Sequence, residues 1–388
     1  MSSSRQLGES RASPKMASSA DSQRFKVYLP QWINELSPSE RPSLRSPVYR
    51  SIRNHMQVVL AYKNFAANRA ISHIGLGVTA LNSAKSLRNT GVNADVWPIT
   101  SAAELSARLR VTPASHVVIS APWIQTNDLA HMCAEFRETQ FAVTCHSNLG
   151  FLQADPSAMR LLREGLELRR TSWNFRMAAN SGRLSNWVQA AYGTPCTLLP
   201  NLYHLESVNP KRERYSGGTL RIGAFGAIRA LKNLMTSAGA ALEIANAKRA
   251  DLEFWISSGR NEGAGSVVDA VRQMLNGLPH VKLVENGWQT WPQFRRTVRH
   301  MHLLMQPSYT ESFNVVTADG VAEGVPSVVS DAIDWAPDSW KAPVDDAHSM
   351  ARVGRKLLNS RWAPRQGLNA LKAHNKTALA AWADFVKN

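Results

Sequence analysis

The chain has 388 residues, is 44% hydrophobic, and carries 45 Lys and Arg against 29 Asp and Glu, a formal net charge of +16 at pH 7. This length and apolar content suit two ordinary domains with their own cores, and no apolar run approaches the roughly 20 residues of a transmembrane helix. Three widely spaced cysteines indicate neither a disulfide framework nor a metal site and favour a reducing cytoplasm, which would be the host cytoplasm for a viral protein. Residues 1–22 are Ser-rich and lack an apolar segment, so we expect a disordered tail and no secretory signal.

The positive charge is concentrated towards the amino terminus, where no Asp or Glu occurs between Arg41 and Ala94. Cations alternating with aromatic rings suit a phosphate backbone with adjacent bases or sugars, and a solvated basic surface is the alternative interpretation. The candidate polyanion-binding or acceptor-binding residues of this segment are Arg45, Arg50, Arg53, Lys63 and Arg69.

The predicted elements alternate between strands and helices. The segment after residue 23 looks irregular, then helix-like from about Val48. A short strand is expected at 71–74, a turn at Gly75-Leu-Gly77, and a helix at 80–89. Strands at 94–99, 116–120, 140–145, 177–180 and 196–199 then alternate with helices at 101–110, 129–138, 156–170 and 183–192. A polar segment at 205–218 separates this block from a second alternating block that starts at 220–224. Such alternation predicts α/β domains with parallel sheets covered on both faces.

We therefore divide the chain into two doubly wound, Rossmann-like domains that face each other across a cleft. The expected parts are a tail at 1–22, an N-terminal domain at 23–204, a linker at 205–218, a C-terminal domain at 219–370, and a final helix at 371–388. Ligands are expected at the carboxyl ends of the strands in such domains.

Residues 305–331, MQPSYTESFNVVTADGVAEGVPSVVSD, read as strand, loop, helix, turn and strand. Pro307 and Ser308 predict the loop, and Gly324 and Pro326 end the helix. A loop carboxylate, Glu311, precedes the helix start. A helix N-terminus offers unpaired N–H groups to a phosphate, and a nearby carboxylate can accept hydrogen bonds from sugar hydroxyls.

This segment resembles the nucleotide-sugar signature of retaining GT-B glycosyltransferases, the glycosyl transferases group 1 or family 4-like enzymes. The matching residues are Pro307, Ser308, Glu311, Ser312, Phe313, Gly324, Val325 and Pro326. Two positions depart, because Asn314 stands where the family usually has Gly and Asp319 stands where it usually has the Glu that binds the donor ribose. The resemblance implies donor binding by Ser312, Phe313, Asn314 and Asp319, and a hold on the sugar by Glu311.

A second segment, GAFGAIRALKN at 223–233, carries Gly226, Arg229 and Lys232 in a turn before a helix. Arg can grip two phosphate oxygens and Lys supplies a compact charge, so the pair suits a diphosphate. It would also stabilise the charge that develops on the departing nucleotide diphosphate. The resembling family places a basic pair in this loop and uses no metal site there, so we expect neither a metal nor a further cofactor.

Two further features flank the expected cleft. The Gly75–Ala80 segment fits the GT-B glycine-rich loop near the donor phosphates, a dinucleotide fingerprint, or a plain turn, and we assign Gly75 and Gly77 to donor binding. His146 follows the strand at 140–145 directly and would face the cleft; in the resembling family a His of this loop lies near the reacting centre. Arg295, Arg296 and Arg299 are interpreted as part of a solvated helix face.

The sequence thus predicts an enzyme, a glycosyltransferase that uses a UDP- or GDP-sugar. The acceptor hydroxyl is expected on a hydroxymethylated pyrimidine in DNA, as in some phage enzymes of this fold, or on a cell-surface or lipid-linked glycan with the basic face on an anionic membrane. Two rival hypotheses are a catalytically idle GT-B relative that binds nucleic acid or glycan, and a nicotinamide-dependent oxidoreductase built on residues 75–80.

Overall fold

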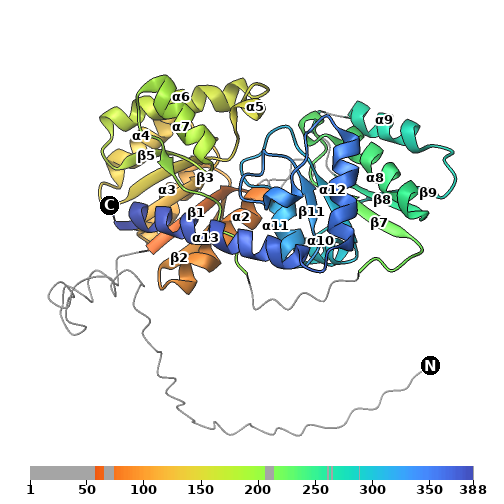
Figure 1. The fold of residues 1–388 in the computed structure, drawn as a ribbon. Helices are drawn as coiled ribbons and strands as arrows, with labels where there is room; N and C mark the ends of the chain where they lie inside the picture. Colours follow the sequence, from red (N-terminus) through yellow and green to blue (C-terminus); the bar gives the residue numbers. More distant parts are fainter. Residues whose placement is uncertain are drawn as a thin grey trace, which may run out of the picture.

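The fold was analysed in a computed structural model, which describes residues 57–64, 74–205, 214–259, 262–263, 265–287 and 289–387. It contains two parallel α/β sheets, each in its own lobe (Figure 1). The expected tail at 1–22, most of the expected linker and four of the five basic candidates, Arg45, Arg50, Arg53 and Arg69, lie outside these residues.

The first sheet has six strands in the order β2-β1-β3-β4-β5-β6. Its strands are β1 (Gln57–Lys63), β2 (Asn93–Ile99), β3 (His116–Ser120), β4 (Gln140–Cys145), β5 (Phe175–Ala179) and β6 (Thr197–Leu198). The helices between them are α2 (Ile74–Asn89), α3 (Ala102–Val111), α4 (Thr126–Glu135), α5 (Leu149–Leu152), α6 (Pro156–Thr171) and α7 (Gly182–Tyr192).

The second sheet has five strands in the order β11-β10-β7-β8-β9. Its strands are β7 (Leu220–Ala224), β8 (Leu252–Ser257), β9 (Val281–Asn286), β10 (Leu303–Gln306) and β11 (Ser327–Val329). The other elements are η2 (Ala230–Lys232), α8 (Leu234–Lys248), α9 (Gly265–Leu275), α10 (Trp291–Arg299), α11 (Val315–Ala322), η3 (Asp338–Trp340), α12 (Ala347–Asn359) and α13 (Ala363–Lys387).

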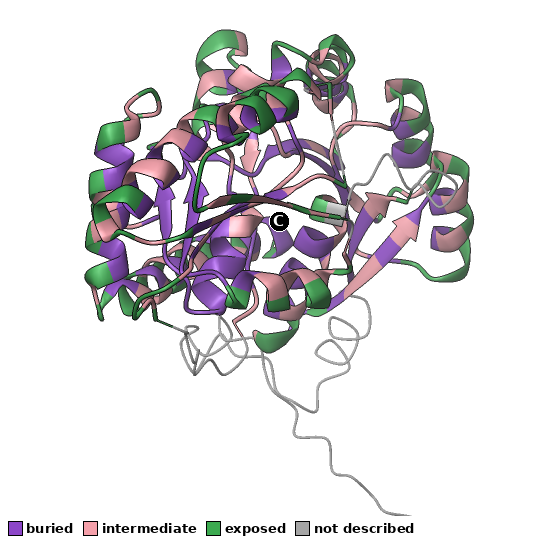
Figure 2. Cartoon of the chain, turned by 90° about the vertical axis from the view of Figure 1, so that its right-hand side faces the viewer, coloured by how far each residue is buried: buried purple, intermediate pink, exposed green. Residues whose placement is uncertain are grey.

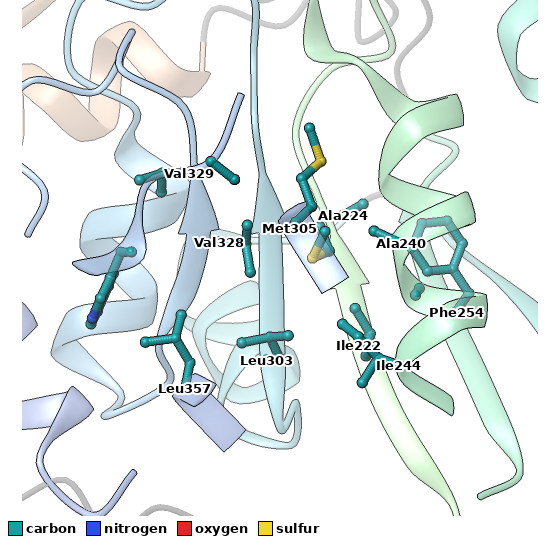
Figure 3. Close-up of a cluster of buried hydrophobic side chains, with 14 of the residues drawn as sticks. Ile222, Ala224, Ala240, Ile244, Phe254, Leu303, Met305, Val328, Val329 and Leu357 are labelled. Atoms are coloured by element: carbon teal, nitrogen blue, oxygen red, sulfur yellow. The ribbon is translucent and has the colours of Figure 1, made fainter. Parts of the chain in front are cut away.

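Both sheets are buried on two faces, because successive strand residues point to opposite sides. In the first sheet, Val59 and Val117 pack with helices α3, α4, α6 and α7, whereas Val58 and Val118 pack with α2 and α13. In the second sheet, Ile222 and Met305 belong to the large core over α8 (Figure 3). Most strands are accordingly buried and the outer helix faces exposed (Figure 2), whereas the edge strand β9 has no fully buried residue.

Helix α13 joins the two lobes, along the lower edge of Figure 1. Its first half packs on the C-terminal core through Leu371, and its second half packs on the first sheet through Ala378 and Trp382. The Trp382 indole N–H donates to the carbonyl of Pro200, 2.8 Å away, which ties the helix to the crossover between the lobes. The helix expected at 371–388 therefore starts earlier than predicted and spans both cores.

The first strand was predicted at the wrong position. Residues 57–63 form β1, where a helix was expected, and Ile74 begins α2, where a strand at 71–74 was expected. Gly75 and Gly77 are consequently in the first turn of a helix and do not form a glycine-rich turn. No helix in the described part of the chain is both long enough and apolar enough to cross a membrane.

Candidate active site between the two sheets

The cleft lies where both sheets reverse their strand order. In the second sheet β7 lies between β8 and β10, and in the first sheet β1 lies between β2 and β3. Ligands of doubly wound sheets bind at the carboxyl ends of the strands that flank such a reversal. The loops after β7 and β10 carry Lys232 and Glu311, and both side chains line a cavity of about 630 Å³ bounded by the two lobes.

Glu311 is held by three donors that converge on its Oε1 atom. The Lys232 ammonium pairs with this oxygen, the Ser308 hydroxyl donates to it at 2.9 Å, and the Asn314 amide donates to it at 3.0 Å. Only 12% of the Glu311 side chain is exposed. The carboxylate is therefore fixed in place with its charge balanced by Lys232.

Asn314 explains why this chain can depart from the family's glycine. Its φ of 63° lies in the left-handed region, where glycine is favoured and Asn is the best-tolerated alternative. The side chain caps α11 by accepting from the Thr317 N–H at 2.8 Å, and its amide also donates to the Gln306 side-chain oxygen at 3.1 Å. Asn314 thus caps the helix, orients Glu311, and satisfies a buried Gln.

The basic loop after β7 faces the same cavity. Arg229 pairs with Glu262, and its guanidinium lies 4.5 Å from the centre of the Phe151 ring, which belongs to α5 of the other lobe. Gly226 has a φ of 121°, a conformation that other residues rarely adopt, and a side chain there would approach Lys232. The predicted cation pair and Glu311 therefore lie on one cavity, although both cations are paired with carboxylates.

Hydrogen bonds across the cleft determine the orientation of His146. The Ser312 hydroxyl donates to the His146 carbonyl at 2.7 Å, so its oxygen must accept from the Asn180 amide, 3.0 Å away. The same amide contacts His146 Nδ1 at 3.2 Å. Nδ1 is then an acceptor and the imidazole proton is on Nε2. Burial lowers the pKa of His146 to about 4, which keeps the ring neutral.

The Asn180 side chain has one unsatisfied polar atom. With its amide nitrogen engaged twice, its Oδ1 is buried without a hydrogen-bond partner among the described residues, in a side chain that is 3% exposed. Asn180 and His146 both line the large cavity. Together they offer a ligand one acceptor and one neutral N–H donor. The contact between Asn180 and Ser312 spans 132 positions, so no local motif predicts it.

A second, smaller cavity of about 200 Å³ adjoins the first. The two share Gly75, Ala227, Val315 and Val316 in their linings. Gly75 is in the first turn of α2, and Val315 and Val316 begin α11. The starts of two helices, one from each lobe, therefore lie where the cavities join, and the partial positive charge of a helix N-terminus favours an anion there.

Asp319 lines the smaller cavity and is almost fully buried. Its Oδ1 accepts from the Tyr203 hydroxyl at 2.6 Å and from the Trp291 indole N–H at 2.9 Å. Burial raises the pKa of Asp319 to about 6, although these two bonds and Arg295 act in the opposite direction. One carboxylate oxygen is thus committed to the protein, and the ribose contact stays a prediction.

The remaining predicted residues are distributed as follows. Lys63, at the end of β1, lines the large cavity, and Ser312 lines it beside Glu311. Phe313 is 2% exposed and stacks on Trp335 at 5.5 Å, so its side chain anchors the loop in the core. Gly77 packs against the Tyr62 ring.

The helix face at 291–299 is solvated at Arg296 and Arg299, as expected, whereas Arg295 is only 24% exposed. Arg295 and Arg299 both pair with Glu323 at 2.6 Å, and the Glu323 side chain is only 3% exposed. These contacts join α10 to the end of α11, close to Asp319. A partner 24 to 28 positions away in sequence cannot be identified from the helix pattern alone.

Neither a family of known sequences nor a curated protein matches the chain, but solved structures do. A glycosyltransferase from Rickettsia africae ESF-5 has a TM-score of 0.57 at 9% identity, covering 86% of this chain and 98% of its own. The trehalose-6-phosphate synthase OtsA has a TM-score of 0.57 at 10% identity, with coverages of 86% and 99%. A variant of TarM from S. aureus, solved with fondaparinux, alpha-GlcNAc-glycerol and UDP, has a TM-score of 0.55 at 12% identity and covers 74% of this chain.

This chain spans only 59% of the length of TarM. At such low identities the likeness establishes the fold, two Rossmann-like domains in the GT-B arrangement, and it confirms the fold class predicted from the sequence. Among the described residues, no cluster of His, Cys, Asp and Glu is suited to holding a metal ion.

Proposed function

We propose that this chain is a glycosyltransferase that moves a sugar from a nucleotide diphosphate sugar to a hydroxyl acceptor. The observation that carries the proposal is the convergence of Glu311, Lys232 and Arg229 with the starts of α2 and α11 on one cleft. The matching solved structures include a trehalose-phosphate synthase and a TarM complex with UDP, which agrees with a UDP-sugar donor, and GDP is the other candidate.

The two cavities suit the two ends of such a donor. The smaller one, between α10 and α11, would take the nucleoside, with Asp319 as the prospective ribose ligand. The diphosphate would lie where the cavities join, near the two helix N-termini and within reach of Arg229 and Lys232. The sugar would then enter the larger cavity beside Glu311.

His146 and Asn180 would bind one hydroxyl of that sugar. A hydroxyl can accept from the His146 Nε2–H while donating to the Asn180 Oδ1, which satisfies the only unpaired polar atom of Asn180. A carboxylate in the same place would face the Asn180 oxygen without a proton to donate. The pair therefore favours a neutral sugar over a uronic acid.

Transfer would break the bond between the anomeric carbon and the diphosphate oxygen and form a bond from that carbon to the acceptor oxygen. The acceptor proton would pass to the departing phosphate, whose charge Arg229 and Lys232 stabilise. Attack on the same face, with retention of configuration, is inferred from the resemblance of residues 305–331 to retaining enzymes. Contacts across the lobes would exclude water and limit hydrolysis.

Two classes of acceptor are proposed. A hydroxymethylated pyrimidine in DNA agrees with the basic segment between Arg41 and Ala94, and a cell-surface or lipid-linked glycan is its rival. Of the predicted polyanion-binding residues, only Lys63 belongs to the described part of the chain, where it lines the larger cavity.

A thermal-shift screen of nucleotide sugars tests the donor. A donor present at a hundred times its dissociation constant would add about 2.7 kcal/mol to the free energy of unfolding. Lys232→Ala should reduce both this shift and sugar transfer. The matched control is Lys248→Ala, because Lys248 lies at the exposed end of α8 and bonds Asn359. Failure of every nucleotide sugar to stabilise the wild-type chain would refute the proposal.

A catalytically idle binding protein is the second candidate, and the occupied Oδ1 of Asp319 favours it. It predicts that a donor stabilises the chain in the same screen but is neither hydrolysed nor transferred. Release of nucleotide diphosphate from a labelled donor, lost in Lys232→Ala, would dismiss it.

A further inference from the structure

The smaller cavity presents a single carboxylate to a ligand. Asp319 is the one charged side chain among the described residues that line this cavity, and it is only 1% exposed. Val315 and Val316, one turn earlier on α11, line the same cavity. Only an edge of the Asp319 carboxylate can therefore meet a bound nucleoside.

The Oδ1 atom of Asp319 has no capacity left for a ligand. It accepts from the Tyr203 hydroxyl at 2.6 Å and from the Trp291 indole N–H at 2.9 Å. A carboxylate oxygen offers about two acceptor positions, so both are used. Neither bond is lost by titration, because an indole N–H only donates, and burial beside Asp319 raises the pKa of Tyr203 well above its usual value. A nucleoside must therefore be held by Oδ2 alone.

The other polar side chains of the smaller cavity offer no second charged acceptor. The Gln289 amide donates to the Thr297 hydroxyl at 2.9 Å, and the Gln289 oxygen accepts from the Asn286 amide at 2.9 Å. The Ser257 hydroxyl oxygen accepts from the Gly226 N–H at 3.3 Å. Hydrogen bonds to neutral groups are about half as strong as those to a carboxylate. The hydroxyl that binds Oδ2 is therefore the one that the site holds firmly.

The direction of the Asp319 side chain favours the 3′ hydroxyl of a pentose. Side chains of a helix tilt towards its N-terminus, so the carboxylate leans towards the start of α11, near which the diphosphate would lie. In a nucleoside diphosphate the 3′ hydroxyl is closer to the 5′ phosphate than the 2′ hydroxyl is. Oδ2 would thus accept from the 3′ hydroxyl, which ribose and 2′-deoxyribose share.

We propose that the donor site does not distinguish ribose from 2′-deoxyribose, so that it binds 2′-deoxynucleoside diphosphate sugars as tightly as ribonucleoside ones. This inference rests on the proposed transferase function and defines its donor class further. Tyr203 and Trp291 are the specificity-determining residues, because they occupy the oxygen that would otherwise accept from the 2′ hydroxyl. A carboxylate with both oxygens open could hold one hydroxyl on each.

Calorimetric titration of the full-length chain tests this with two matched pairs of probes, UDP with dUDP and GDP with dGDP. The members of each pair differ only in the 2′ hydroxyl. The titration is run at about pH 8, because the pKa of Asp319 is about 6 and the carboxylate is then ionised. For the base that binds, the two dissociation constants should agree within about threefold, whereas a lost hydrogen bond to a carboxylate would separate them about tenfold or more.

Tyr203→Phe is the first variant, because it keeps the ring, opens one position on Oδ1, and lies outside the lining of the smaller cavity. The ribonucleotide should then bind at least about fivefold more tightly than its deoxy partner. Trp291→Phe is the second variant, in case the first disturbs the core, and it should change the ratio in the same direction. A general disturbance would weaken both nucleotides equally and leave their ratio unchanged.

The matched control is Tyr215→Phe, which loses a bond to the Gly218 carbonyl and lines neither cavity, so its ratio should equal that of the wild type. A wild-type preference for the ribonucleotide above about threefold would overturn this proposal alone. A ratio unchanged in both Tyr203→Phe and Trp291→Phe would overturn the assignment of these two residues. Absence of binding by all four probes would instead overturn the transferase function on which the proposal rests.

Discussion

Replacement of Asn314 is the sharpest structural test of the site, because one side chain serves three partners. In Asn314→Ala the α11 cap is lost, which costs about 1 kcal/mol of stability. The Gln306 oxygen, in a side chain only 2% exposed, loses the amide donor of Asn314, which costs about 1–3 kcal/mol. Alanine at a φ of 63° adds about 1 kcal/mol of backbone strain. We therefore expect a loss of about 3–5 kcal/mol in the free energy of unfolding.

Asn314→Gly separates the backbone from the side chain. Glycine adopts the left-handed conformation freely, and losing the bond from the Thr317 N–H costs only about a few tenths of a kcal/mol, so loss of the Gln306 and Glu311 bonds dominates. The glycine variant should be about 1–2 kcal/mol more stable than the alanine variant. Because Lys232 and Ser308 still hold Glu311, it should also retain donor binding with a KM raised only a few-fold.

Urea unfolding followed by circular dichroism measures the stabilities, and release of nucleotide diphosphate from the donor measures the activity. Equal free energies of unfolding for the alanine and glycine variants would show that the left-handed backbone causes no strain in alanine at this position. An alanine variant as stable as the wild type would refute the reasoning altogether, since all three partners would then be replaceable.

Asp319→Asn should change how stability depends on pH. Burial raises the pKa of Asp319 from 3.8 to about 6, so the folded chain binds the proton more tightly and the wild type loses up to about 3 kcal/mol as pH rises from 4 to 7. The free energy of unfolding of the variant minus that of the wild type, measured with urea, should therefore be larger at pH 7 than at pH 4. The same difference at both pH values would contradict the raised pKa of Asp319. Gly367→Ala would place a methyl group 2.4 Å from the buried Trp340 ring, so we expect a loss of about 1–3 kcal/mol by thermal unfolding. Gly239→Ala, with its nearest neighbour at 3.6 Å, is the matched control and should cost nothing.

The sequence predicted the fold well where apolar strands are bounded by clear turns. The strands at 116–120, 140–145 and 220–224 were placed at their observed bounds. The exception is β1, because QVVLAYK follows a basic, aromatic segment with no turn signal before it. Misplacing that strand also moved Gly75 and Gly77 from a helix to a loop.

The site was less accessible to prediction, because its geometry depends on pairs distant in sequence. Glu311 and Lys232 could be named from local motifs, but their ion pair, 79 positions apart, could not. The orphan oxygen of Asn180 follows from a hydrogen-bond chain through Ser312 and His146, which only the assembled lobes provide. Motifs therefore identify which residues matter, and the contacts across the cleft decide what each can do.

Those contacts also bear on how a donor would be captured. The Asn148 amide of the N-terminal lobe donates to the Glu311 carbonyl at 2.5 Å, and Gly150 lies so close to Thr310 that a Cβ there would be 3.1 Å from its side chain. The loop bearing Glu311 is thus held by both lobes. The N-terminal lobe bonds its backbone, and residues of the C-terminal lobe bond its carboxylate. If the lobes separate, Glu311 keeps Lys232 but loses its backbone restraint. Under the proposed function, the geometry that would hold the sugar is therefore complete only when the cleft is closed, which would link donor capture to exclusion of water.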